Sequence, residues 1–163
     1  ALIYVEEDLS EYGKFDLGIP SDEFMDSKTT VTVSGFPQVV HGSFDDANCE
    51  YLYKADGVIL NCHSYAGENN WQFKGHPQKQ ENFFSHQLMT SAYGSGGDSG
   101  GPIYMTINVG SNEYHTVVGI YTSVGLNDVD YDGNDEQVSF GVRMTSSLLR
   151  FYYNNDYINS SLN

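Results

Sequence analysis

The chain has 163 residues, enough for one domain with a hydrophobic core and too few for two ordinary domains. Its 22 acidic side chains against 7 Lys and Arg give a formal net charge of −15, which excludes partners with a phosphate backbone or an anionic lipid surface. No apolar run approaches the roughly 20 residues that a membrane-spanning helix needs. The composition therefore predicts neither a nucleic-acid nor a membrane partner.

The first segment pairs an apolar run with a polar stretch. Ala1–Val5 is a strongly apolar β-type run, and Glu6–Lys14 is polar and linker-like. This pattern is typical of a strand that closes a preceding unit and is followed by a connection. We predict that residues 1–28 are the last strand of a preceding unit plus a linker.

Residues 29–144 read as one all-β unit. Short β-type runs, alternating or continuously apolar, are separated by Gly, Asn, Asp and Pro. Several short strands with turns between them favour a closed barrel or a sandwich. The predicted strands are Thr29–Gly35, Gly57–Cys62, Gly101–Ile107, His115–Thr122 and Val138–Met144.

Two cysteines, Cys49 and Cys62, flank a segment that reads as one arm, a turn and another arm. A disulfide between them would suit an extracellular protein. Two reduced, buried thiols explain the same spacing, because spacing does not fix the geometry that a disulfide requires. Both interpretations stay open.

An acidic loop resembles the first half of a calcium-binding loop. Asp128, Asp130 and Asp132 alternate and are followed by Gly133 at the position of the sharp turn. The twelfth position is Ser139, where a bidentate Glu is expected. A solvated acidic connection explains the same residues, so no cofactor is predicted and calcium stays an open alternative.

Residues 145–163 predict a helix and a tail. Thr145 or Ser146 can cap the N-terminus of this helix. Apolar and aromatic side chains then recur at helical spacing, at Leu148, Leu149, Tyr152 and Tyr153.

The segment with the clearest chemical potential is the glycine-rich stretch around Ser99. Glycines on both sides of the serine allow a tight turn, at which the amides of Gly97 and Ser99 can converge on one point. Converging amides are what stabilising an acyl-transfer oxyanion requires. A Gly-x-Ser-x-Gly hydrolase elbow needs a helix after the serine, whereas Pro102 and a β-run follow here.

The string Gly97-Asp98-Ser99-Gly100-Gly101-Pro102 resembles the nucleophile signature of the chymotrypsin/trypsin family of serine proteases. Other landmarks of the family appear in the same order as in the family. They are similar to the motif after the catalytic aspartate, the opening of the second barrel, the specificity-pocket strand and its far wall. These segments are Ala1–Ile3, Val33–Pro37, Val117–Ser123 and Phe140–Thr145. The second of them is closest to bacterial glutamyl endopeptidases.

The resemblance implies a fold and an activity. The fold would be a chymotrypsin-like six-stranded antiparallel β-barrel, the second of two, followed by a C-terminal α-helix. Residues 1–28 would then be the last strand of the first barrel plus the interdomain linker. The activity would be that of a secreted serine endopeptidase acting on polypeptides, with Ser99 as nucleophile and acyl-enzyme carrier. The amides of Gly97 and Ser99 would form the oxyanion hole. The Asp98 side chain would turn inward and hold the loop in shape.

The resemblance also implies a specificity pocket. Tyr93 stands where trypsin-like enzymes have an aspartate, and Tyr121 stands where glutamyl endopeptidases usually have a histidine. Cleavage after Lys, Arg or Glu is therefore not expected, and Tyr93 is expected to shorten the pocket in favour of small or medium apolar side chains. The floor would be Tyr93 and Gly94, one wall Thr122, Ser123 and Val124, and the other wall Gly141.

A catalytic base is missing from the pattern. None of the five histidines, at positions 41, 63, 76, 86 and 115, has the sequence context of the family's catalytic histidine, and the catalytic aspartate would fall two positions before Ala1. We therefore expect the histidine and aspartate to come from a first barrel that is a separate chain or an upstream segment. A catalytically inactive, protease-like binding module is the alternative.

Overall fold

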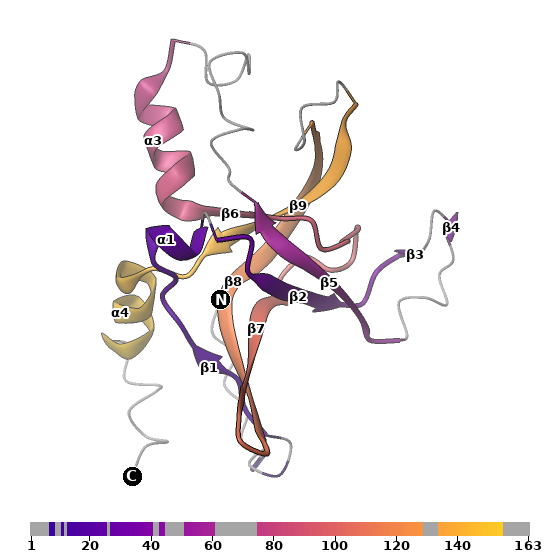
Figure 1. The fold of residues 1–163 in the computed structure, drawn as a ribbon, viewed down its shortest axis with the longest axis vertical. Helices are drawn as coiled ribbons and strands as arrows, with labels where there is room; N and C mark the ends of the chain where they lie inside the picture. Colours follow the sequence, from indigo (N-terminus) through magenta and orange to yellow (C-terminus); the bar gives the residue numbers. More distant parts are fainter. Residues whose placement is uncertain are drawn as a thin grey trace.

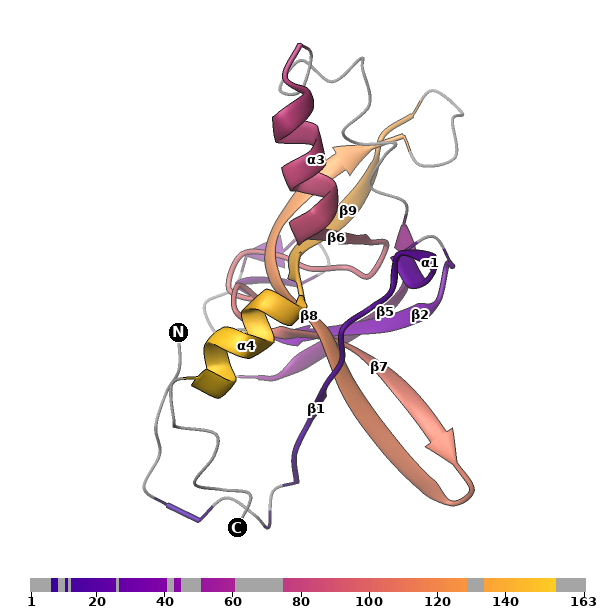
Figure 2. The same ribbon diagram turned by 90° about the vertical axis from the view of Figure 1, so that its left-hand side faces the viewer.

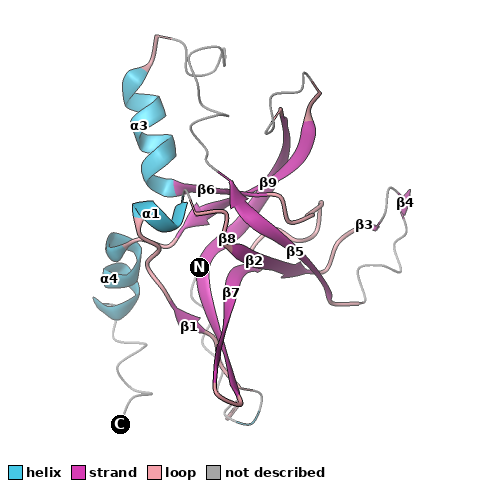
Figure 3. Cartoon of the chain, viewed as in Figure 1, coloured by secondary structure: helices cyan, strands magenta, loops and turns pink. Residues whose placement is uncertain are grey.

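The structure is a computed structural model that describes residues 7–8, 11, 13–25, 27–40, 43–44, 51–60, 75–128 and 134–154. Strands make up nearly half of the described residues (Figure 3). The helices that accompany them are α1 (Asp22–Met25), α3 (Pro77–His86) and α4 (Ser146–Asn154). Ala1–Ile3, the two cysteines, Asp130 and Asp132 lie outside the described residues, so the expectations that rest on them stay predictions.

Six strands form a closed, barrel-like ring of antiparallel pairings (Figure 1). The order around the ring is β2-β5-β6-β9-β8-β7, and β7 returns to β2 through the pairs Thr32–Tyr104 and Val33–Ile103. The prediction of an all-β, barrel-like fold is confirmed. The strands are β2 (Thr30–Gly35), β5 (Tyr53–Leu60), β6 (Gln87–Thr90), β7 (Pro102–Val109), β8 (Asn112–Asn127) and β9 (Glu136–Arg143).

The core lies inside this ring. Along β2 it takes the apolar side chains of alternate residues, because successive residues point to opposite faces of a sheet, whereas consecutive residues are buried in β6 and β9. Val31 and Val33 of β2 are 1% and 2% exposed, and Ile59, Leu88 and Ile103 are fully buried. Tyr121, at 1% exposure, is the largest of these fully buried side chains.

Helices α1, α3 and α4 lie along one side of the sheet (Figures 1 and 2). The predicted C-terminal helix is confirmed as α4, and of the two predicted caps Thr145 fills the position, since its Oγ1 accepts a hydrogen bond from Leu148 N at 3.2 Å.

The sequence did not predict α3 or the short β6 that follows it. The α3 helix has no buried residue, and its half-buried Phe83 and Phe84 are adjacent in sequence and form no helical stripe. Phe83 packs against Phe140 of β9 with ring centroids 6.1 Å apart. This tertiary contact, rather than an amphipathic pattern, attaches the helix to the sheet.

The described part of the predicted linker is attached to the sheet. The two-residue β1 (Asp16–Leu17) pairs in parallel with Thr116 and Val117 of β8. Phe15 packs against Tyr104 at a centroid distance of 5.0 Å, and Met25 of α1 is 7% exposed and joins the core. A second, two-stranded sheet pairs β3 (Val39–Val40) with β4 (Ser43–Phe44).

Two further observations bear on partners. None of the described helices is long and apolar enough to span a lipid bilayer. Among the described residues, no three His, Cys, Asp or Glu side chains are grouped as they would be around a metal ion. Asp128 is described and half-buried, while the rest of the calcium-like loop up to Gly133 is not.

Candidate active site

Ser99 lies in the loop between β6 and β7, and backbone hydrogen bonds fix this loop to β8. Gly100 N donates to Tyr121 O at 2.9 Å, and Tyr121 N donates to Gly101 O at 2.8 Å. Within the loop, Asp98 N donates to Ser95 O at 3.2 Å. The serine is therefore on a tight turn with a fixed position relative to the sheet.

Gly97 holds the other side of the same loop against the end of β2. Its φ of 101° lies in a region that side-chain-bearing residues avoid, and a Cβ would stand 2.4 Å from the carbonyl oxygen of Phe36. Next to it, Gln38 N donates to Gly96 O at 2.7 Å. Only glycine allows this approach of two backbone segments.

The amides of the Ser99 turn fall into two groups. Those of Asp98, Gly100 and Gly101 all donate to backbone carbonyls. Those of Gly97 and Ser99 donate to no group within the part of the chain that the structure describes. The glycine-rich turn therefore has two N–H groups, one of them on the serine itself, that have no acceptor among the described residues.

The Ser99 hydroxyl is directed toward β8. Its Oγ donates a hydrogen bond to the carbonyl oxygen of Thr122 at 3.3 Å, a long contact, and the residue is exposed. The register between β8 and β9 shifts between Tyr121 and Ser123, so Thr122 is the extra residue of a bulge. Ser99 therefore lies where β8 bends, with its hydroxyl accessible.

Asp98 turns inward from the same loop. It is 6% exposed, its Oδ2 accepts a hydrogen bond from Ser95 N at 2.9 Å, and its Oδ1 has no partner among the described residues. Burial raises the pKa of this carboxyl above its usual range, and the hydrogen bond from Ser95 lowers it in part. A Cβ on Gly35 would stand 2.4 Å from Oδ1, so the carboxyl packs against β2.

The predicted pocket walls lie on neighbouring strands. Tyr121 pairs with Gly141 of β9, and Ser123 pairs with Phe140. Thr122 Oγ1 also donates to Phe140 O at 3.2 Å. Thr122, Ser123 and Val124 are exposed, and Gly141 is buried. Because β8 and β9 are paired here, the two predicted walls are directly adjacent in the ring.

Two tyrosines, Tyr93 and Tyr121, are expected at the pocket from the sequence, and the structure buries Tyr121 rather than Tyr93. Tyr93, expected to shorten the pocket, is 45% exposed. Tyr121 is 1% exposed and packs directly on Gly94. Its position in the strand just before Thr122 was the available signal, but sequence alone does not tell which of two nearby tyrosines fills a space.

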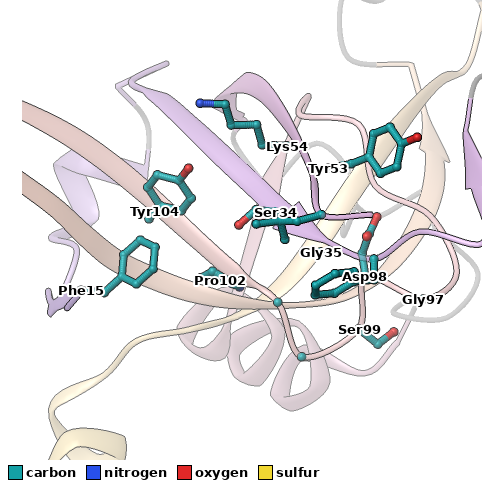
Figure 4. Close-up of a pocket in the computed structure, with 14 residues that line it drawn as sticks. Phe15, Ser34, Gly35, Tyr53, Lys54, Gly97, Asp98, Ser99, Pro102 and Tyr104 are labelled. Carbon is teal, nitrogen blue, oxygen red and sulfur yellow. The ribbon is translucent and has the colours of Figure 1, made fainter. Parts of the chain in front are cut away.

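A groove of about 740 Å³ opens on the other side of Ser99 (Figure 4). Gly97, Asp98 and Ser99 lie at one end, and Phe15 and Tyr104 lie at the other. Sequence reasoning missed this face, since its residues come from distant segments. Its exposed apolar side chains are Phe15 (45%), Phe36 (48%), Leu52 (66%) and Tyr53 (38%).

The described histidines have other contacts. His86 Nδ1 lies 3.0 Å from Asn82 O, and His115 contacts Thr106 at 3.0 Å and Glu113 at 3.7 Å. His76 stands at the N-terminus of α3. None of these three is bonded to Ser99; His41 and His63 are outside the described residues.

Comparison with known proteins adds no family assignment. No family model matches the chain, and the search of curated proteins finds no match. The chemistry of the site therefore rests on its own geometry: an accessible serine hydroxyl, two unengaged amides beside it and a buried carboxyl beneath the turn.

Proposed function

We propose that this chain is the serine-bearing barrel of a secreted, chymotrypsin-like serine endopeptidase. The observation that carries the proposal is the pair of unengaged amides, at Gly97 and Ser99, beside the exposed Ser99 hydroxyl. Water can accept from such amides in an exposed turn. Two of them beside an exposed serine hydroxyl also meet the requirement of acyl transfer, which depends on a donor pair at the oxyanion.

In the proposed reaction, Ser99 Oγ attacks the carbonyl carbon of a peptide bond and its proton passes to a histidine base. The negative charge that develops on the carbonyl oxygen is stabilised by the two amides. The C–N bond then breaks, the base gives its proton to the leaving amine, and an acyl ester forms on Ser99. Water, deprotonated by the same base, hydrolyses the ester and restores the serine.

The base and its orienting aspartate are proposed to come from a part outside the described residues. The exposed apolar groove next to Ser99 supports this, because large side chains such as Phe36 and Leu52 are ordinarily covered by a partner surface. The six-stranded ring followed by a helix is also the arrangement that the resemblance implies for a second barrel. In this proposal a first barrel, which is a separate chain or an upstream segment, covers the groove.

The second candidate is a catalytically inactive, protease-like binding module. The observation that favours it is that none of His76, His86 and His115 is in a position to activate Ser99. Without a base, a serine hydroxyl is a weak nucleophile.

A fluorophosphonate probe applied to the intact protein separates the two candidates. We expect one covalent adduct on Ser99, located by peptide mass spectrometry, and none in Ser99→Ala. Ser85→Ala, which removes an exposed serine of α3, is the matched control and should be labelled like the wild type. A folded wild-type protein without any adduct would support the binding module.

A further inference from the structure

Tyr121 is a core residue of the barrel that stands next to both predicted pocket walls in the strand pairing. It lies on β8 immediately before Thr122, whose carbonyl accepts the Ser99 hydroxyl, and it pairs with Gly141 across the seam to β9. Its side chain is 1% exposed. The aromatic ring of Tyr121 is thus in the core of the barrel, and its neighbour in the chain, Thr122, contacts the proposed nucleophile.

The phenol end of Tyr121 packs onto Gly94, the predicted pocket floor. A Cβ built on Gly94 would stand 2.4, 2.7 and 2.9 Å from Cε2, Cζ and Oη of the tyrosine. No real Cβ approaches other atoms so closely, so the ring lies in direct contact with the glycine backbone. The space next to Gly94 is therefore filled by the protein's own side chain.

The floor is held in this position by side chains of β9. Gln137 Nε2 donates to Gly94 O at 2.9 Å, and Ser139 Oγ donates to Ala92 O at 2.7 Å. On the other side, Ala92 N donates to Thr90 Oγ1 at 3.1 Å. The loop therefore has little freedom to move away and make room above the ring.

The buried phenol is uncharged. Burial, the nearby carboxyl of Asp98 and the nearby Tyr93 raise the pKa of Tyr121 to about 12, and a hydrogen bond with Ser139 lowers it in part. A neutral ring supplies no charge for binding a basic or an acidic side chain.

We infer that Tyr121 is the residue that sets the cleavage specificity: its ring occupies the space that a substrate side chain would enter. The substrates are then polypeptides with glycine, alanine or serine on the acyl side of the cleaved bond. This inference rests on the proposed function and replaces Tyr93 by Tyr121 as the residue that shortens the pocket. A larger side chain would have to displace a packed aromatic ring, and even one methylene changes selectivity by roughly 10- to 200-fold in an apolar pocket.

The test applies to the intact protein two peptidyl phosphonates that differ only in the side chain next to the phosphorus, alanine-like or phenylalanine-like. The rate of Ser99 modification is followed by intact mass. We expect the wild type to react at least about tenfold faster with the alanine-like probe, and Tyr121→Ala to prefer the phenylalanine-like probe. Tyr114→Ala, which removes a 44% exposed tyrosine of the same strand, is the matched control and should keep the wild-type preference.

Other outcomes separate the inference from the proposed function. Wild-type modification that is faster with the phenylalanine-like probe, or an unchanged preference in folded Tyr121→Ala, overturns the inference and leaves the function standing. No modification by either probe overturns both.

Folding is checked by thermal unfolding, and Tyr121→Leu replaces the alanine variant if the latter is unfolded. In folded Tyr121→Ala, millimolar phenol should also raise the melting temperature by filling the emptied space, while the wild type should not respond. A response of the wild type would show that the space is not filled by Tyr121 and would overturn the inference.

Discussion

The two sides of the Ser99 loop differ sharply. On one side, toward β8 and β9, Tyr121 fills the space over Gly94, and hydrogen bonds from Gln137 and Ser139 fix Gly94 and Ala92. On the other side, toward β2 and β5, an open groove exposes Phe36 and Leu52. Ser99 therefore lies between the closely packed interior of the barrel and an exposed apolar groove.

We therefore expect the packed side to contribute to the stability of the fold and the open side to contribute to association with another surface. A filled site is sensitive to added atoms, because protein interiors are close-packed and relax only partly. An exposed apolar face contributes little to the stability of the folded chain alone. It contributes binding free energy when another surface covers it. Substitutions on the two sides should thus have effects of different size.

The largest effect is expected on the filled side. Gly94→Ala places a methyl group against the Tyr121 ring and should lower the free energy of unfolding by about 1–3 kcal/mol, measured by urea denaturation. Gly96→Ala is the matched control, since its Cβ would meet only Gln38 Oε1 at 3.6 Å, and it should change stability by no more than about 0.5 kcal/mol.

Combining Gly94→Ala with Tyr121→Leu sharpens the same comparison. The smaller side chain should remove the clash, so the double variant should lose less stability than the sum of the two single variants. Additive losses would contradict the direct packing of Tyr121 on Gly94.

A smaller and pH-dependent effect is expected at the boundary, for Asp98→Asn. Burial raises the pKa of the Asp98 carboxyl in the folded protein above its ordinary value of 3.8. Stability that depends on the protonated carboxyl is complete below that value and is lost as pH rises through the raised pKa. The asparagine variant should therefore gain stability relative to the wild type as pH rises from about 4 to 7, measured by urea denaturation at each pH.

The opposite slope would contradict this expectation. A wild type that gains stability over the asparagine variant with rising pH would mean that the ionised carboxylate is the stabilised form. A cation would then have to reach Oδ1, the oxygen that has no partner among the described residues.

The smallest effect is expected on the open side. Leu52 is 66% exposed, so Leu52→Ala should change the free energy of unfolding by no more than about 0.5 kcal/mol. A loss above 1 kcal/mol would mean that the groove is already covered by residues of this chain, and the contrast between the two sides would fail.

The sequence alone predicted local structure: most of the strands, the turn at Ser99 and the cap of α4. The alternation of apolar residues located five of the six ring strands, although β8 extends beyond the predicted His115–Thr122 at both ends. The glycine pattern around Ser99 located the turn, because glycine is required wherever φ is positive or two backbones meet. A hydroxyl before an amphipathic run located the cap of α4.

Only the tertiary structure decided what lies next to Ser99. The groove joins Phe15, Phe36 and Leu52, which are far apart in the chain, and sequence periodicity carries no information on such meetings. The choice between Tyr93 and Tyr121 as the buried ring depends on the bulge at Thr122 and on the bonds that fix Gly94. Both are properties of how strands pair and pack across the ring, and local sequence preferences do not encode them.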